Sequence, residues 1–486
     1  MKRGAWAGAI AGTVTAAAMY VAALLTGIKP LPDLLAEPVL ALLPGPVFGF
    51  LIDRLQHLGK VLEEAGLLVA MVVALAVLGA GYSALASRRR VPQLGLLAGA
   101  VAWVVTCLVV LPLAGEGFLG LNEGVATPLV WAVLYVIYAV LLETAATPLP
   151  EAADTGRRRI PLVLAGVGVV VLGARLVPTW YRTVLGAPEA GLSGPVPELT
   201  PAANFYVVSK NFSDPQVSTN GWSLQVTGLV DSQLRLSYQD LRALPSHTQY
   251  TTLECVSNNV GGPQISTGQF TGVLLKELLD RAGLRAAAQA LLFRARDDYQ
   301  ESIPVSLLDD GLEILVAYDL NGAPLPAAHG FPARILIPGH YGMKGPKWLD
   351  GIEAVPHVIN GYWENQGWNR DAVVKTMSRI DSPGDGAILK PPVTLAGIAF
   401  AGVRGIQRVE VSTDGGQSWT EAELKPPLSS LTWTLWSFPW SASRSGQYAL
   451  QVRATDGAGQ LQSADGRPSY PDGSSGYHTV RVSLGG

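Results

Sequence analysis

The chain has 486 residues, of which 15% are charged and 49% are hydrophobic, and its formal net charge is -3. A chain of this length is expected to form two or three domains. The low charged fraction and the mean hydropathy of +0.28 indicate that part of the chain lies in lipid. The small net charge argues against a nucleic-acid partner.

Apolar runs fill the first 180 residues. Five of them approach the ~20 residues that a membrane-spanning helix needs, and they lie at 4–27, 67–86, 94–113, 127–143 and 161–178. The sequence therefore predicts an all-α membrane domain over 1–180, with about five transmembrane helices in contact with membrane lipid. The apolar segment 38–55 is interrupted by Pro44 and Pro46, so we expect an interfacial or re-entrant piece there.

Three basic clusters set the predicted orientation, at residues 2–3, 88–90 and 157–159. With positive charge held inside, the N-terminus is cytoplasmic and the chain leaves the cell membrane on the extracytoplasmic side after Pro178. A cleaved signal peptide is the alternative interpretation of 4–27. The arginines at 157–159 are also similar to a twin-arginine export signal, and a plain inside-positive anchor is the alternative.

Only one histidine, His57, lies in this half, outside the predicted spans. A haem held between helices usually takes two axial side chains, commonly histidines. No b-type haem of that kind is therefore predicted. The sequence also has no Cys-x-x-Cys-His motif and no ferredoxin-like cysteine cluster. Electrons are expected to pass through a separate partner, such as a cytochrome or a quinone-linked membrane protein.

A stretch rich in glycine and proline predicts a linker over 181–201. Short helices and strands beyond it predict an α+β domain over 202–385. The predicted elements are strands at 222–229, 303–308 and 312–318, a helix that Ser237 caps and Pro245 ends, an amphipathic helix over 270–283, and a hairpin turn at 321–322.

Short strand-like segments recur over residues 386–486. They lie at 393–400, 406–412, 416–423, 432–438 and 448–455, with glycine-containing turns between them. Regular spacing of this kind predicts an all-β, Ig-like sandwich as the last domain.

Cys255 is one of only two cysteines in the chain, and the other, Cys107, lies in a predicted span. A disulfide between them is therefore not expected. A lone cysteine is most often a small buried apolar residue. Here, however, the flanking residues are polar and loop-like, and a Gly-Gly-Pro turn follows at 261–263.

Two stretches together resemble the sulfite oxidase family of molybdenum-cofactor enzymes. The first is Thr-Leu-Glu-Cys at 252–255. The second runs from His-Gly-Phe-Pro-Ala-Arg at 329–334, through Pro-Gly at 338–339, to Lys-Trp-Leu at 347–349. The resemblance covers about residues 200–486. It implies a molybdenum–molybdopterin cofactor with Cys255 as the metal ligand, and a last domain similar to the dimerisation domain of that family, with a homodimer left open.

The resemblance also implies which residues bind the cofactor. They are Asn204, Phe205, Tyr206, Cys255, His329, Arg334, Gly342, Lys344 and Lys347. Arg334 carries a fork of donors for the phosphate or the pterin, and His329 suits the pterin edge. Lys344 and Lys347 flank glycines and suit a phosphate, with a solvated turn as the alternative.

The chain departs from sulfite oxidases around the substrate. Val208 and Val260 stand where that family places arginines, and Trp368 stands in the region of a family tyrosine. Each lost charge-assisted contact is worth about 1.5–3 kcal/mol, which disfavours sulfite. We expect Tyr341 and Trp368 to act with Cys255 in catalysis. Aromatic residues here suit a neutral substrate, and core packing is the alternative for about half of them.

The sequence thus predicts a membrane-anchored molybdopterin-dependent oxidoreductase that transfers an oxygen atom to or from a small-molecule substrate. Reduction of an S-oxide or N-oxide on the extracytoplasmic side is favoured. Oxidation of sulfite or a related small substrate is the alternative, because the sequence does not fix the direction of the reaction. The alternative of another class is a non-catalytic membrane binding module that keeps the fold.

Overall fold

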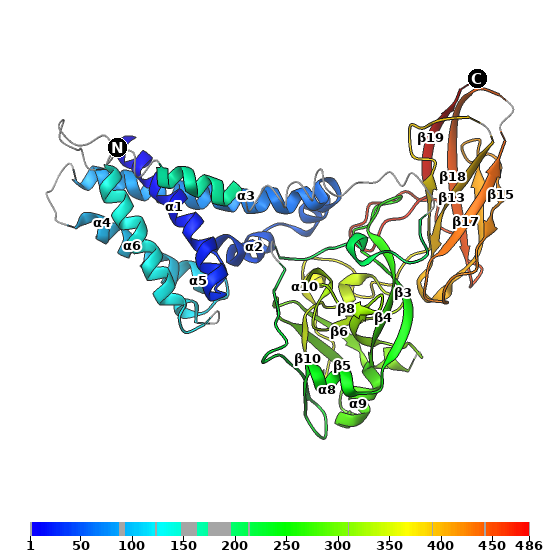
Figure 1. Ribbon diagram of the computed structural model, residues 1–486, viewed down its shortest axis with the longest axis horizontal. Helices are drawn as coiled ribbons and strands as arrows, with labels where there is room; N and C mark the ends of the chain where they lie inside the picture. The colour runs from blue at the N-terminus through cyan, green and yellow to red at the C-terminus, as the bar shows by residue number, and fades with distance from the viewer. Residues whose placement is uncertain are drawn as a thin grey trace. The chain divides into compact units, whose positions relative to one another are not determined.

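The computed structural model describes residues 2–86, 93–121, 124–146, 163–173, 196–211, 214–309, 311–390, 392–441 and 444–485. The chain divides into two compact units, with Met1–Phe48 and Leu55–Ala187 in the first and Gly49–Arg54 and Pro188–Gly486 in the second. The first unit is built from helices and the second mainly from strands (Figure 1).

Long apolar helices make up the first unit. They are α1 (Lys2–Thr26), α2 (Leu31–Ala41), α3 (Gly45–Ala86), α4 (Leu94–Val105) and α6 (Thr127–Ala146); the π-helical turn Thr106–Val110 and α5 (Leu111–Leu113) continue α4, and η2 (Phe118–Gly120) follows. Four stretches of the described chain are long and apolar enough to cross a membrane: Gly4–Thr26, Gly59–Ala86, Leu94–Leu113 and Thr127–Ala146. They coincide with four of the five predicted spans.

Other predictions for this half fall partly or wholly outside the described residues. Of the fifth predicted span, 161–178, the structure describes an apolar helix over Val163–Gly173. The basic clusters 88–90 and 157–159 and most of the predicted linker 181–201 are not among the described residues.

The apolar segment 38–55 is interrupted beside Pro44 and Pro46, as the sequence predicts, because α2 ends at Ala41 and α3 begins at Gly45. Pro46 stands in the first turn of α3, where its missing N–H would have no partner in the helix. α3 then continues without a break through the second predicted span. The interfacial or re-entrant placement of this segment stays a prediction.

Glycines allow α1 to lie very close to α3. A Cβ on Gly8 would lie 2.6 Å from the carbonyl oxygen of Leu75 and 3.0 Å from the Cα of Gly79. Small residues at a helix crossing let two backbones approach in lipid, where apolar burial gives little drive for association.

Gly8→Leu is expected to force α1 away from α3, because the new side chain has no room against the α3 backbone. Overpacking of this kind typically costs about 1–3 kcal/mol. Gly66→Leu is the matched control, since a Cβ on Gly66 meets no atom within 4 Å. Thermal unfolding in detergent measures the difference, and equal melting temperatures for the two variants would contradict the packing argument.

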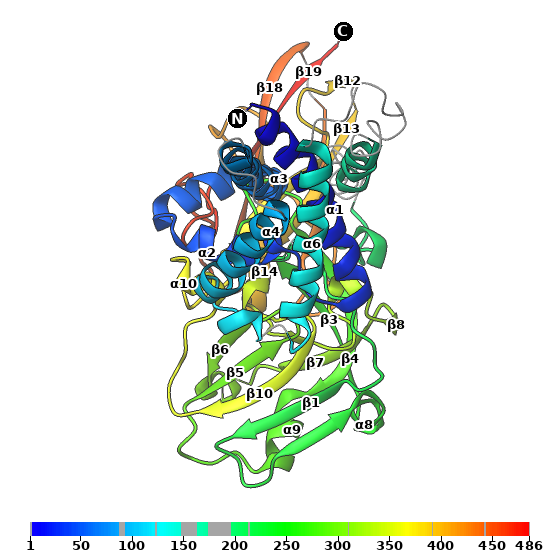
Figure 2. The ribbon, with the colours of Figure 1, turned by 90° about the vertical axis from the view of Figure 1, so that its left-hand side faces the viewer.

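Two five-stranded sheets form the first part of the second unit. One has the order β2-β1-β10-β5-β6 and is seen in Figure 2. Its strands are β1 (Ser223–Gly228), β2 (Leu234–Ser237), β5 (Ala290–Ala295), β6 (Gln300–Pro304) and β10 (Leu349–Val355). The other has the order β3-β4-β7-β8, with β9 paired to β7. Its strands are β3 (His247–Glu254), β4 (Ile265–Leu274), β7 (Leu315–Leu320), β8 (Ala323–Pro324) and β9 (Arg334–Leu336).

Short helices accompany these sheets: α8 (Tyr238–Ala243), α9 (Leu275–Ala282) and α10 (Tyr362–Asn365). The largest core lies around β1, α9, β5 and β10, and includes Leu224, Leu278, Phe293 and Ile352. The α+β architecture predicted for this part of the chain is confirmed.

Local signals located several elements correctly. Ser237 caps α8 through a reciprocal pair of bonds with Asp240, at 3.2 Å and 2.9 Å. The predicted strand 222–229 corresponds to β1, and the turn at 321–322 joins β7 to β8.

The helix predicted over 270–283 is wrong in its first part. Residues 270–274 belong to β4, and α9 begins at Leu275. β4 pairs with β3 on one side and β7 on the other, and this pairing overrides the local pattern. Similarly, the predicted strand 303–308 ends at Pro304, where β6 passes into the turn Val305–Leu308.

The last part of the second unit has two further sheets around one core. One has the order β11-β13-β17-β16, with β11 (Met377–Ser382), β13 (Val393–Phe400), β16 (Glu423–Leu424) and β17 (Thr434–Trp440). The other has the order β12-β19-β18-β14-β15, with β12 (Ile388–Leu389), β14 (Ile406–Ser412), β15 (Thr420–Glu421), β18 (Gly446–Asp456) and β19 (His478–Leu484). β11 begins before residue 386, and β19 was not predicted.

His478 connects these two sheets. Its Nδ1 accepts a hydrogen bond from the amide of Ile380 in β11, at 3.0 Å. If Nδ1 were protonated, its N–H would face the N–H of Ile380, and the hydrogen bond would be lost. Burial, together with the charge of Arg379, lowers the pKa of His478 to about 4.

The stability of the second unit is therefore expected to fall as the pH drops from 6.5 through 4. The folded ring stays neutral over this range while the unfolded histidine binds a proton. His478→Asn should reduce this loss by roughly 1–2 kcal/mol. His247→Asn is the control, because His247 is partly exposed beside Glu313. Denaturant unfolding at pH 7 and pH 4.5 measures the effect, and an unchanged pH profile in His478→Asn would contradict it.

Candidate active site

Cys255 follows directly after β3, in a loop that backbone hydrogen bonds hold in place. Its amide donates to the carbonyl oxygen of Gln264 at 3.0 Å, and its own carbonyl oxygen accepts from the amide of Asn258 at 3.0 Å. The thiol is 9% exposed, and its sulfur lies 3.1 Å from the hydroxyl of Ser257. Burial raises the pKa of the Cys255 thiol. A bound metal cation would reverse this shift by favouring the thiolate.

Three side chains from separate segments lie within electrostatic reach of Cys255. Burial, followed by the charge of Cys255, raises the pKa of Tyr206. Burial also raises the pKa of Tyr341, with smaller effects from Glu254 and Cys255. The pKa of Lys347 is lowered to about 8, mainly by burial. The structure thus gathers three predicted residues around the predicted metal ligand.

Arg334, in β9, is buried without a carboxylate partner. It is 6% exposed, and its Nη1 donates to the carbonyl oxygen of His329 at 3.3 Å. Its Nε has no partner in the described part of the chain. Burial lowers the pKa of Arg334 to about 10. Since a buried charge needs a counter-charge, the surroundings of Arg334 suit an anionic group that the described residues do not supply.

Lys347 lies beside this guanidinium and is also short of negative charge. Its Nζ donates to the hydroxyl of Ser209 at 2.8 Å and to the carbonyl oxygen of Ala328 at 3.0 Å. The carboxylate of Asp214 is 4.0 Å away. The backbone at Gly330 lies close to Lys347, because a Cβ on Gly330 would lie 3.0 Å from the Cα of Lys347.

His329 ties the segment before β1 to this cluster. Its Nε2 donates to the carbonyl oxygen of Ala202 at 3.0 Å. Burial, with the charge of Arg334, lowers the pKa of His329 to about 4, so the ring is neutral near pH 7. Phe205 is buried and packs edge-on against this ring, at 5.4 Å between centroids. Asn204, by contrast, is exposed at the end of the turn Ala202–Asn204.

The turn η7 (Gly342–Lys344) closes the site from another side. A Cβ on Gly342 would lie 2.8 Å from the hydroxyl of Tyr206, so only glycine permits this close approach. The ammonium group of Lys344 points elsewhere. It is 2.7 Å from Glu301 and 2.6 Å from Glu364, and the side chain is 3% exposed. The phosphate contact predicted for Lys344 does not match this placement, because two carboxylates already hold its charge.

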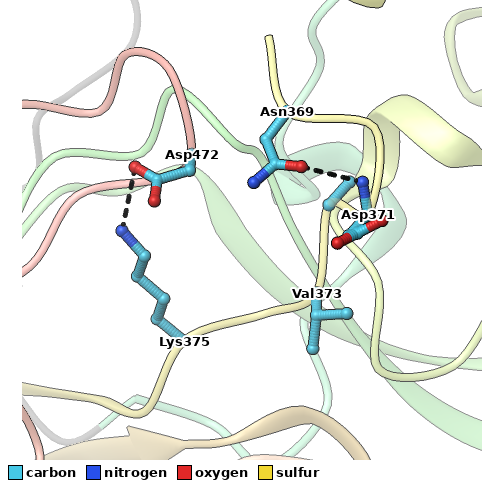
Figure 3. Close-up of a pocket in the computed structure, with 6 residues that line it drawn as sticks. Asn369, Asp371, Val373, Lys375 and Asp472 are labelled. Atoms are coloured by element: carbon cyan, nitrogen blue, oxygen red, sulfur yellow. Dashed lines mark hydrogen bonds and ion pairs between the residues drawn. The ribbon is translucent and has the colours of Figure 1, made fainter.

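Figure 3 shows a pocket of about 210 Å³ in the second unit. It is lined by Asn369, Asp371, Ala372, Val373, Lys375 and Asp472. The amide of Tyr341 donates to the carbonyl oxygen of Ala372 at 2.8 Å, and its hydroxyl accepts from the amide of Lys375 at 3.3 Å. Lys375 and Asp472 form an ion pair of 3.2 Å at the pocket wall. Tyr341 therefore links the pocket to the surroundings of Cys255.

Trp368 lies in the aromatic segment that precedes this pocket. It is 4% exposed and packs edge-on against Tyr470, at 5.4 Å between centroids. Its indole Nε1 is buried without a partner in the described chain. An unpaired buried donor is costly, so a ligand oxygen would be stabilised there.

Three buried carboxylates near the site were not predicted from the sequence: Glu254, Glu301 and Glu364. Glu254 precedes Cys255, and its Oε1 accepts a hydrogen bond from the side-chain Nδ2 of Asn258 at 3.0 Å. Its Oε2 has no partner in the described chain, and burial raises its pKa to about 7. Its place next to Cys255 was the one local signal that could have identified it.

The site thus combines the Cys255 thiol with two buried cations. Arg334 has no ion pair among the described residues, and Lys347 has a long ion pair of 4.0 Å with Asp214. These residues fit a cofactor that carries a soft-ligand metal and anionic groups, since thiolates bind such metals and guanidinium and ammonium groups bind phosphate.

Comparison with known proteins agrees with this chemistry. Residues 211–363 match the model of the oxidoreductase molybdopterin binding domain. Residues 372–470 match that of the Mo-co oxidoreductase dimerisation domain. The predicted cofactor class is therefore supported by the family itself.

Mitochondrial sulfite oxidase from Mus musculus is 32% identical over 269 residues, which are 46% of this chain and 49% of that protein. An NADH nitrate reductase from Brassica napus is 30% identical over 304 residues, which are 50% of this chain and 33% of that protein. The chain spans about half the length of the sulfite oxidase.

The crystal structure of the sulfane dehydrogenase SoxCD from Paracoccus pantotrophus has the same fold. It matches with a TM-score of 0.52 and 22% identity, over 60% of this chain and 82% of that one. With the two matched domain models and these relatives, residues 211–470 are similar to the sulfite oxidase family of molybdopterin-dependent oxidoreductases.

Proposed function

We propose that this protein is a membrane-anchored molybdenum-cofactor enzyme that reduces a small S-oxide or N-oxide by oxygen-atom transfer on the extracytoplasmic side. The observation that carries the proposal is the loss of cations from the substrate side. The resemblance to sulfite oxidases places arginines at the positions of Val208 and Val260. Val260 is 36% exposed. A neutral oxide needs no such cations, whereas an oxyanion loses two charge-assisted contacts.

The cofactor, when bound, supplies a metal that exchanges an oxygen atom and two electrons with the substrate. The chain supplies its binding site. Cys255 would hold the metal through its thiolate, and Arg334 and Lys347 would hold the anionic groups of the cofactor. His329, neutral and fixed by Ala202, would hold its pterin side.

Two buried donors suit the oxygen atom of an S-oxide or N-oxide. Burial raises the pKa of Tyr341, so its phenol keeps its proton at neutral pH and can donate a hydrogen bond. The Nε1 of Trp368 has no partner among the described residues. We propose that these donors orient the substrate oxygen and polarise its bond, which is the role of preorganised donors in a dry site.

The pocket beside Tyr341 would admit the substrate. Its volume of about 210 Å³ suits a small molecule, and Lys375, Asp472 and Asn369 give it a mixed polar wall. We propose that substrates reach Tyr341 through this pocket, because the hydroxyl of Tyr341 accepts from the amide of Lys375.

The membrane assignment belongs to the same proposal. Four long apolar helices support an anchor, and the basic clusters of the sequence support a cytoplasmic N-terminus with an exported second unit. The two C-terminal sheets are proposed to form an Ig-like sandwich, and the match to a dimerisation domain supports a homodimer. Electrons would come from a separate cytochrome or quinone-linked membrane protein.

The test is to purify the full chain in detergent and measure its molybdenum and released pterin. Reduced viologen dye would then be offered with S-oxides, N-oxides and nitrate, and ferricyanide with sulfite. We expect about one molybdenum per chain and turnover of a neutral oxide. Faster oxidation of sulfite than reduction of every oxide would contradict the proposed direction. Chains without molybdenum, from cells that make the cofactor, would favour the alternative of a non-catalytic binding module.

A further inference from the structure

Lys344 lies at the centre of a buried cluster of charges behind the turn Gly342–Lys344. Its Nζ donates to Oε1 of Glu301 at 2.7 Å and to Oε1 of Glu364 at 2.6 Å. Lys344 is 3% exposed, Glu301 0% and Glu364 8%. Short charge-assisted bonds between groups this deeply buried fix the position of the lysine side chain.

The cluster joins three segments that are distant in sequence. Glu301 comes from β6, Lys344 from η7 and Glu364 from α10. Each carboxylate is also anchored to its own backbone: Glu301 accepts from the amide of Ser302 at 2.8 Å, and Glu364 accepts from the amide of Gly361 at 3.1 Å. Lys344 therefore links the turn at the cofactor side to the helix that opens the aromatic segment 361–368.

The charges in this cluster do not balance. Two buried carboxylates face one buried ammonium group. Arg370 forms a longer ion pair of 3.6 Å with Glu364, but its side chain is 54% exposed. Oε2 of Glu301 has no partner among the described residues. Burial raises the pKa of Glu301 to about 7, against the effect of Lys344. The cluster is therefore rich in negative charge and holds a proton readily.

Such an environment is unsuited to a phosphate. If Lys344 turned toward a phosphate, Glu301 and Glu364 would lose their buried counter-ion, which costs several kcal/mol in comparable cases. A phosphate dianion placed beside these carboxylates would also be repelled. Arg334 has no ion pair among the described residues, and Lys347 has one long ion pair of 4.0 Å with Asp214, so both are less tightly held by carboxylates than Lys344.

We propose that Lys344 is a positioning residue: it clamps the turn Gly342–Lys344 to the segment 361–368 through Glu301 and Glu364, and it does not itself bind the cofactor. The clamp holds Gly342 close to the hydroxyl of Tyr206, where a Cβ would approach to 2.8 Å. It also fixes α10, which leads to Trp368. This role rests on the proposed function, because the turn matters only if the cofactor lies against it.

The test compares three variants of the full chain in detergent. Lys344→Met leaves Glu301 without its cation and leaves Glu364 only the exposed Arg370, and we expect it to keep less than about one-tenth of the wild-type molybdenum content. The triple variant Lys344→Met, Glu301→Gln, Glu364→Gln removes all three charges. If Lys344 only positions, the triple variant should recover to within about twofold of the wild type, since no charge is left unpaired. Lys276→Met, at an exposed ion pair of 2.9 Å, is the matched control.

A direct phosphate contact gives the opposite result. The triple variant would then hold as little molybdenum as Lys344→Met, and the clamp would be overturned. A second measurement uses cofactor-free chain from cells that cannot make the cofactor. The clamp predicts a lower melting temperature for cofactor-free Lys344→Met than for cofactor-free wild type, and a phosphate contact predicts equal values. If wild type itself binds no molybdenum, the proposed function fails, and the cofactor-free comparison still decides on the clamp.

Discussion

Cys255→Ala is expected to abolish both molybdenum binding and oxygen-atom transfer while leaving the fold intact. The side chain is small and buried after β3, and the loop is held by backbone bonds to Gln264 and Asn258 that the substitution keeps. Changes beyond the ligands of a metal site already cost 10–100-fold, so loss of the ligand itself should reduce activity by more than about 100-fold. Elemental analysis and reduction of the best neutral oxide measure the two losses.

Cys107→Ala is the matched control, because Cys107 is also buried but lies in the first unit. It should retain full molybdenum content. Cys255→Ser adds a graded test: a hydroxyl is a harder and weaker ligand than a thiolate, so any metal retained should show an altered absorption spectrum. Unchanged molybdenum content and activity in Cys255→Ala would contradict the assignment of the metal ligand.

The residues that sequence reasoning located best are those whose role is local. The capping box at Ser237 and the turn at 321–322 need only neighbouring residues, and both are confirmed. Cys255 and the motif at 329–334 were likewise recognisable as short patterns. The structure then shows that Tyr206, Arg334 and Lys347 lie around one centre, which the order of motifs alone did not establish.

The errors share a different physical cause. Residues 270–274 have a helical pattern but are paired with strands on both sides, so their structure depends on β3 and β7. Lys344 stands in a motif that suits a phosphate, yet its partners lie 43 and 20 residues away in the chain. Such partners are determined by folding and have no signature next to the lysine.

A similar limit applies to the carboxylates. Glu254, Glu301 and Glu364 are charged residues in a sequence that places most charges at the surface, and a buried position is unusual for them. Their burial follows from the sheet and the helix that carry them. The clamp around Lys344 was therefore visible only in three dimensions.

The second large effect is expected at Arg334, where substitution should change stability and cofactor binding in opposite directions. The guanidinium is buried, its Nε lacks a partner in the described chain, and burial lowers its pKa to about 10. In the cofactor-free protein this charge is a cost. Arg334→Met keeps the side-chain volume and removes the charge, so it should stabilise the cofactor-free second unit by roughly 1–2 kcal/mol.

The same substitution should remove most of the molybdenum, because the anionic groups of the cofactor lose their bidentate donor. Arg379→Met provides the contrast. Arg379 is equally buried but pairs with Asp381 at 2.5 Å, so its loss leaves an uncompensated carboxylate and should destabilise the unit by about 3–5 kcal/mol. Denaturant unfolding of both variants, prepared without cofactor, measures these opposite signs. If cofactor-free Arg334→Met unfolds as readily as Arg379→Met, then Arg334 stabilises the fold itself, and its proposed role in binding an anion is contradicted.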